Sequence, residues 1–180
     1  MEKSTEALDI LLLQETKLCD GTTFPLSDLV FPPEDVCNGF AYAYRRHSIC
    51  TLTLLDSTTF TTDDRQLQIL QIHDPRLHKP LTLVNLYVRG SSAADSCQWD
   101  FLRGLSDTYE NLRVVGDFNA RHFSWDSSGV NPNGRGLAEA LLDLDLHLLN
   151  TGEPPGLQNV QATLTLALTL PSAAVISKAG

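Results

Sequence analysis

Residues 112–120 read L-R-V-V-G-D-F-N-A, an apolar segment that runs directly into polar residues. Residues 112–115 predict a strand, and Gly116 allows the backbone to bend there or to approach another group closely. Asp117 and Asn119 are two positions apart, so on an extended backbone their side chains face the same side. A strand that ends in an ordinary turn explains the same residues, because Gly, Asp and Asn are common turn residues. The choice between a functional site and an ordinary turn depends on motifs elsewhere in the chain.

Composition indicates a single globular domain that spans residues 1–180. The chain is 42% hydrophobic and 19% charged, and a chain of 180 residues is long enough to bury one sizeable core. Its 13 basic and 22 acidic residues give a net charge of −9, which argues against a broad basic surface for nucleic acid. An acidic site that binds a divalent cation is compatible with this charge.

The cysteines and the N-terminus indicate an intracellular chain, either nuclear or cytoplasmic. The four cysteines contain no Cys-x-x-Cys pair, so we expect reduced structural thiols and not a zinc site. The apolar run at residues 10–13 is too short for a signal peptide or a membrane span. We therefore expect no membrane partner.

Most of the chain predicts sheet segments joined by polar turns. Residues 19–40 and 131–134 are rich in turn residues and are expected to be loops. No internal repeat or linker divides the sequence. Apolar runs and alternation predict strands, and apolar stripes at helical spacing predict helices. The expected strands are residues 9–14, 49–55, 65–72, 81–88, 112–115, 146–150 and 163–170, and the expected helices are residues 98–109 and 136–144.

Four further side chains are candidates for a functional site. Glu15 follows the first apolar run, and is either a solvated strand end or a ligand for a hard cation such as Mg²⁺ or Mn²⁺. Asn85 and Tyr87 share one face of an expected strand, and Asn85 is a candidate contact for a phosphate or a bound water. Tyr87 is either half-buried packing or a hydrogen-bond donor to a phosphate oxygen. His122 is either an ordinary loop histidine or a contact for a phosphate or a bound water.

Four motifs occur in a specific order: L-L-Q-E-T-K-L, N-L-Y-V, V-V-G-D-F-N-A-R-H-x-x-W-D and L-L-N-T-G-E-P-P. Together they resemble the endonuclease/exonuclease/phosphatase family, in the branch found in non-LTR retrotransposons, over residues 9–172. The resemblance implies an α+β fold, a four-layer α/β/β/α sandwich of two mostly antiparallel sheets flanked by helices. It also implies a DNA endonuclease that hydrolyses a phosphodiester with Mg²⁺ or Mn²⁺.

The same resemblance implies a role for the candidate residues. Glu15 would bind the metal, and Asp117 would orient or deprotonate the attacking water. Asn119 and Tyr87 would hold the phosphate. These roles agree with elementary chemistry. The metal would offset negative charge that develops on the phosphoryl oxygens, the acid would orient or deprotonate the water, and neutral donors would stabilise the transition state.

The chain departs from the family pattern at three places. It opens just after the strand that carries the family's metal-site asparagine, and no Ser-Asp-His motif precedes Gly180. Thr165 stands where the family has the aspartate of an Ile-Asp-Leu-Thr-Leu pattern. We therefore expect a domain that is incomplete at both termini, with impaired activity and with open sheet edges that favour self-association. The alternatives are a non-catalytic remnant, inert or partner-binding, and a phosphatase of the same family.

Overall fold

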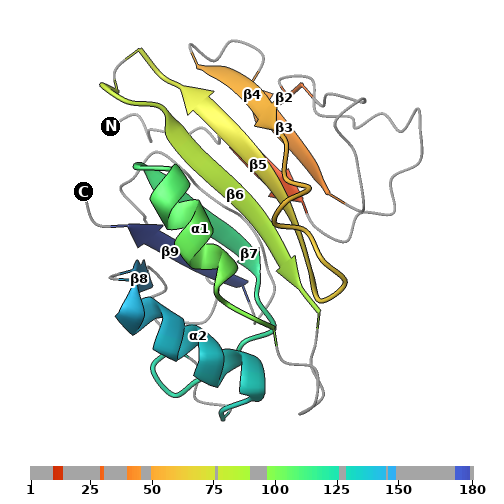
Figure 1. Ribbon diagram of the computed structural model, residues 1–180. Coiled ribbons are helices and arrows are strands. Elements are labelled where there is room, and N and C mark those ends of the chain that lie inside the picture. Colours follow the sequence, from red (N-terminus) through yellow and green to blue (C-terminus); the bar gives the residue numbers. More distant parts are fainter. Residues whose placement is uncertain are drawn as a thin grey trace, which may run out of the picture.

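The protein is an α+β sandwich of two packed sheets, one of which is covered by helices (Figure 1). The computed structural model describes residues 10–13, 29–30, 40–45, 50–75, 77–89, 97–125, 129–144, 146–148 and 173–178. The smaller sheet has the order β1-β3-β2, with β1 at Ile10–Leu13, β2 at Leu29–Val30 and β3 at Ala41–Arg45. Both of its pairings are antiparallel.

The larger sheet has six strands in the order β4-β5-β6-β7-β9-β8. Only the β6–β7 pair is parallel, and the other pairs in this sheet are antiparallel. The strands are β4 (Thr51–Leu55), β5 (Arg65–His73), β6 (Leu81–Val88), β7 (Leu112–Asp117), β8 (Leu146–Leu148) and β9 (Ala173–Lys178).

Helices α1 (Phe101–Thr108) and α2 (Pro132–Asp143) lie on one face of the larger sheet (Figure 1). Helix α1 connects β6 to β7, as the parallel pairing of these two strands requires. The expected α+β sandwich with mostly antiparallel sheets is confirmed. The second helical layer of the expected four has no counterpart among the residues that the structure describes.

Two apolar clusters hold these layers together. On the helix side, α1 buries Leu102 and Leu105 and α2 buries Leu137 against the large sheet. Between the sheets, Ile10 and Leu12 of β1 pack with a second cluster that includes Leu83 and Val115. The apolar stripes expected along both helices are therefore the faces that they bury.

The structure differs from the expected elements at four places, of which three involve the sheets. Strand β2 lies inside the expected loop at 19–40, and its two residues pair with β3, so tertiary pairing overrides local loop composition. Strand β3 was not expected. Strand β9 was not expected either, and it lies between β7 and β8. The strand expected at 163–170 lies outside the described residues.

The fourth difference is the start of helix α2. Asn131 and Pro132 belong to the segment expected to be a loop, yet Pro132 is the first helical residue. The Asn131 side chain accepts a hydrogen bond from the backbone N–H of Gly134 at 2.8 Å. An asparagine N-cap followed by proline is a standard helix start, because the cap satisfies an otherwise unpaired N–H and proline has none to lose.

No helix in the described part of the chain is long and apolar enough to cross a membrane.

Candidate active site at the ends of strands β6 and β7

A row of polar residues crosses the large sheet at the end of β7. Gln66 of β5 is the register partner of Tyr87 of β6, and Tyr87 is the register partner of Asp117 of β7. Residues in register on neighbouring strands point to the same face of a sheet. Asp117 is 8% exposed and Tyr87 is half-buried. The structure thus brings these two predicted site residues together.

The next row towards the middle of the sheet is still partly polar. Gln68 of β5 pairs in register with Asn85 of β6, which in turn pairs with Val115 of β7. Gln68 and Asn85 are both fully buried. Asn85 therefore shares a face with Tyr87, as its spacing in the sequence predicts, and the site includes two glutamines that were not predicted.

Asn119 reaches the same place by a turn and not by an extended strand. Its φ of 45° is left-handed, a conformation in which asparagine is enriched among non-glycine residues. The Asn119 backbone N–H donates to Asp117 Oδ1 at 3.0 Å, and its Nδ2 donates to the Val88 carbonyl at 2.7 Å. The expectation that Asp117 and Asn119 share one extended face is therefore wrong in its geometry, because the chain turns immediately after β7.

Two asparagines at the start of α2, the N-cap Asn131 and Asn133 of the first turn, hold the backbone of this loop. Asn131 Nδ2 donates to the Asn119 carbonyl at 2.7 Å, and Asn131 Oδ1 accepts from the Arg121 N–H at 2.9 Å. Asn133, which is fully buried, places its Nδ2 3.4 Å from the same Asn119 carbonyl. The sequence analysis missed both residues, although an Asn-Pro pair before an apolar stripe is a recognisable helix start.

Gly134 allows α2 to approach the loop this closely. A Cβ at this position would lie 1.8 Å from the Arg121 carbonyl oxygen and 2.8 Å from the Arg121 nitrogen. No rotamer change relieves such a contact, because the obstructing atoms belong to the backbone. The loop after β7 and the first turn of α2 therefore form one closely fitted unit.

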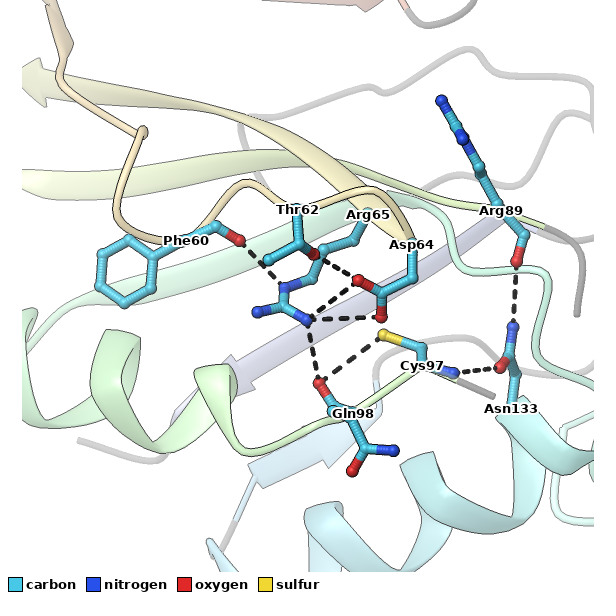
Figure 2. Close-up of polar contacts among 8 residues, drawn as sticks. All are labelled: Phe60, Thr62, Asp64, Arg65, Arg89, Cys97, Gln98 and Asn133. Atoms are coloured by element: carbon cyan, nitrogen blue, oxygen red, sulfur yellow. Dashed lines mark hydrogen bonds and ion pairs between the residues drawn. The ribbon is translucent and has the colours of Figure 1, made fainter. Parts of the chain in front are cut away.

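A second set of contacts extends this unit towards β5 (Figure 2). Asn133 Oδ1 accepts from the Cys97 N–H at 2.9 Å, and its Nδ2 lies 3.3 Å from the Arg89 carbonyl. Arg65 donates to the Phe60 carbonyl at 2.9 Å and forms an ion pair with Asp64 at 3.4 Å.

Two ionisable groups of this network have shifted pKa values. Burial, followed by the neighbouring Asp64 carboxylate, raises the pKa of Cys97 to about 12. Partial burial raises the pKa of Asp64, but the hydrogen bond from Thr62 and the charge of Arg65 outweigh it, so the pKa of Asp64 is lowered. Cys97 is accordingly an inert, buried thiol.

His122 belongs to a tight turn beside the loop and not to the polar row. Its Nδ1 lies 3.0 Å from Ser124 Oγ and accepts from the Ser124 N–H at 3.3 Å. Its ring lies 4.9 Å from the ring of Trp125. These contacts hold the His122 ring within the turn.

The metal ligand predicted at Glu15 lies outside the described residues. Within the described residues, no three histidines, cysteines or acids form a group that would hold a metal ion. The polar row itself offers the Asp117 carboxylate and side-chain amide oxygens, which are ligand types that Mg²⁺ and Mn²⁺ accept. Within the described residues, the row therefore provides one anionic ligand, Asp117, together with neutral amide oxygens.

Comparison with solved structures supports the fold. The endonuclease domain of TRAS1, a telomere-specific non-LTR retrotransposon, matches with a TM-score of 0.55 at 20% identity, over 94% of this chain and 67% of that one. The human Nocturnin catalytic domain, solved with a bound sulfate anion, matches with a TM-score of 0.55 at 16% identity, over 94% of this chain and 69% of that one. At such identities the likeness concerns the fold alone.

Comparison of sequences identifies the family. The chain is 26% identical over 154 residues to the probable RNA-directed DNA polymerase from transposon BS of Drosophila melanogaster. This match covers 82% of the chain but only 16% of that protein. The model of the endonuclease–reverse transcriptase family matches residues 81–179, more than half of the chain. With its sandwich fold and retrotransposon relatives, the chain belongs to the endonuclease–reverse transcriptase family and is an endonuclease/exonuclease/phosphatase-type domain.

Proposed function

We propose that the chain is a divalent-metal-dependent DNA endonuclease domain of retroelement type, which hydrolyses a phosphodiester by attack of water. The observation that supports this proposal most directly is the register of β6 and β7. It places Tyr87 and Asp117 side by side on one face, with Asn119 anchored to the end of β6. The retrotransposon relatives support DNA as the substrate.

Asp117 is the group that we assign to the attacking water. Its carboxylate is oriented, because Oδ1 accepts from the Asn119 N–H at 3.0 Å. The second carboxylate oxygen would accept a proton from the water as the water oxygen bonds to phosphorus. The bond from phosphorus to the leaving oxygen then breaks, and that oxygen takes up a proton.

Asn119 and Tyr87 would hold the phosphate through neutral donors. One N–H of the Asn119 amide is used on the Val88 carbonyl, which orients the second N–H of the same nitrogen. The Tyr87 phenol, next to Asp117 in the row, can donate to another phosphate oxygen. Donors placed in advance in this way stabilise developing charge without reorganising during the reaction.

Glu15 would hold the divalent cation, which when bound offsets charge on the phosphoryl oxygens. Asn85, fully buried beside Tyr87, would maintain the polar environment of the row. Thr165 carries no charge at the position where the family resemblance implies an aspartate, which supports a rate below that of a family domain with this aspartate.

The test is nicking of supercoiled plasmid in Mg²⁺, for the chain and for two aspartate variants. We expect slow nicking that EDTA stops and that falls about 10²-fold or more in Asp117→Ala. Asp107→Ala, which changes an exposed aspartate on α1, is the matched control and should nick at the unmodified rate. Equal rates in the two variants, or nicking that persists in EDTA, would refute the proposal.

A further inference from the structure

The turn at His122–Trp125 is held rigidly beside the candidate site. The Trp125 N–H donates to the His122 carbonyl at 3.0 Å, which closes the turn. The Trp125 indole Nε1 donates to the Ala120 carbonyl at 2.9 Å, and its ring packs against the helix-side core. The backbone of this turn is therefore fixed a few residues after Asp117.

Phe123 lies at the tip of this turn and is 73% exposed. A single exposed apolar side chain is ordinary on a protein surface. Phe123 differs because its turn is fixed on both sides, by Trp125 and by the contacts between His122 and Ser124. The ring is thus presented to solvent by a rigid support.

Three exposed arginines belong to segments whose backbones are joined beside this turn, although the chain has a net charge of −9. Arg121, Arg89 and Arg135 are all exposed and come from three separate segments. Their backbones contact the same two asparagines. The Arg121 N–H donates to Asn131 Oδ1 at 2.9 Å, and the Arg135 N–H donates to the Asn131 carbonyl at 3.0 Å.

The backbone of Arg89 is linked to the same loop through Asn133. Asn133 Nδ2 lies 3.3 Å from the Arg89 carbonyl. The side chain of Arg89 extends away from Asn133, so the contact leaves its guanidinium group free of that residue (Figure 2). The loop after β7, the first turn of α2 and the segment that follows β6 therefore each carry one exposed arginine, and their backbones are joined through Asn131 and Asn133.

We propose that Phe123, Arg89, Arg121 and Arg135 form a contact surface for double-stranded DNA next to the cleaved bond. Guanidinium groups bind phosphates bidentately and fix the position of the duplex. An apolar ring on a rigid tip packs into a groove against sugars or between base steps, as apolar wedges of other DNA-binding proteins do. Charge complementarity favours this occupant, since phosphates flank the bond that the site would cleave. The choice of DNA rests on the proposed function.

The test measures binding and not cleavage, so it remains informative if the chain proves inactive. Anisotropy of a fluorescein-labelled DNA duplex is followed in EDTA at several salt concentrations. Each of Arg89→Ala, Arg121→Ala and Arg135→Ala should reduce the slope of log K against log salt by about 0.9. Phe123→Ala should weaken binding about tenfold and leave that slope unchanged, because it removes stacking and not charge.

Two control variants match these changes elsewhere on the surface. Arg103→Ala removes an exposed arginine of α1, and Leu142→Ala removes an apolar residue of α2 that is 85% exposed. Both should bind like the unmodified chain. The proposal is overturned if the controls lose as much affinity as the test variants, if the arginine variants keep the full salt slope, or if a matched RNA duplex binds as tightly as DNA.

Discussion

The two faces of the large sheet are built from the same strands but differ in composition. The face under the helices contributes apolar residues of β5, β6 and β7 to the core, such as Leu67, Leu86 and Val114. The face towards the small sheet is apolar at one end, around Leu83, and polar at the other, around Asp117.

This difference shows how one sheet can bury a core and also carry a polar site. On the inner face the rows Ile72–Leu81 and Leu70–Leu83 are followed by Gln68–Asn85 and then by Gln66–Tyr87. The side chains change from apolar to polar while the backbone pairing continues. On the helix-side face the neighbouring rows Ile69–Val84 and Leu67–Leu86 are apolar, so the sheet can hold a polar site on its other side.

The largest effect is expected when an amide replaces a buried apolar residue of the inner face. Leu83→Asn should lower the free energy of unfolding by about 4 kcal/mol, because it removes a fully buried leucine and buries an amide between the sheets. Urea denaturation measures the change.

The reciprocal variant places a leucine at the polar end of the inner face. Asn85→Leu should lower the free energy of unfolding by about 1–2 kcal/mol, since it adds apolar surface but leaves the partners of a buried amide unsatisfied. Plasmid nicking should nonetheless fall with Asn85→Leu. Equal losses of stability in Leu83→Asn and Asn85→Leu would show that the two ends of the face are physically alike.

The next largest effect concerns the fit of α2 against the loop after β7. Gly134→Ala places a Cβ 1.8 Å from the Arg121 carbonyl oxygen, so we expect a loss of about 3 kcal/mol in unfolding free energy. Gly104→Ala in α1 is the matched control, because its Cβ would meet only the Phe60 ring at 3.1 Å. Denaturation curves of the two variants should differ clearly, and similar curves would contradict the close fit.

A smaller effect is expected when a support of the site is removed. Asn133→Ala should lower stability by about 2 kcal/mol and should also slow nicking, because the Asn119 and Arg89 carbonyls and the Cys97 N–H lose a partner. Ser106→Ala, at a buried polar residue of α1, should affect stability alone. Asn133→Ala that nicks at the unmodified rate would argue against a positioning role.

The smallest effect concerns Cys97, where the helix-side core meets the polar network. Its pKa is about 12 when folded against an ordinary value of 9.0, so the folded chain keeps the thiol proton at pH values where the unfolded chain loses it. The contribution to stability is complete below about pH 9 and is lost as the pH rises towards 12. Alkylation with iodoacetamide at pH 8, mapped by peptide mass, should modify Cys97 only after denaturation.

The Cys97→Ala variant provides the control for this last expectation. Its free energy of unfolding should fall less steeply between pH 9 and pH 12 than that of the unmodified chain. Modification of Cys97 in the native chain at the rate seen after denaturation would contradict the burial of this thiol.

Much of the fold follows from local pattern. The alternation in β5 and β6, the stripe of Trp99, Leu102 and Leu105, and the apolar run before Gly116 each predict an element that the structure contains. These patterns are reliable because the backbone period, two residues in a strand and 3.6 in a helix, decides which side each residue faces. The motif order likewise indicates the family, because each short motif is weak but their combination is specific.

Long-range contacts account for what local pattern does not reveal. Strand β2 exists only through pairing with β3, and the join between α2 and the loop after β7 depends on Asn131, Asn133 and Gly134 meeting Asn119 and Arg121. No spacing rule of a helix or a strand connects residues that lie ten or more positions apart in this way. The sequence therefore contains the chemical groups of the site and the periodicity of its strands. The register of β6 against β7, and the turn that anchors Asn119, arise when apolar burial forces those strands together.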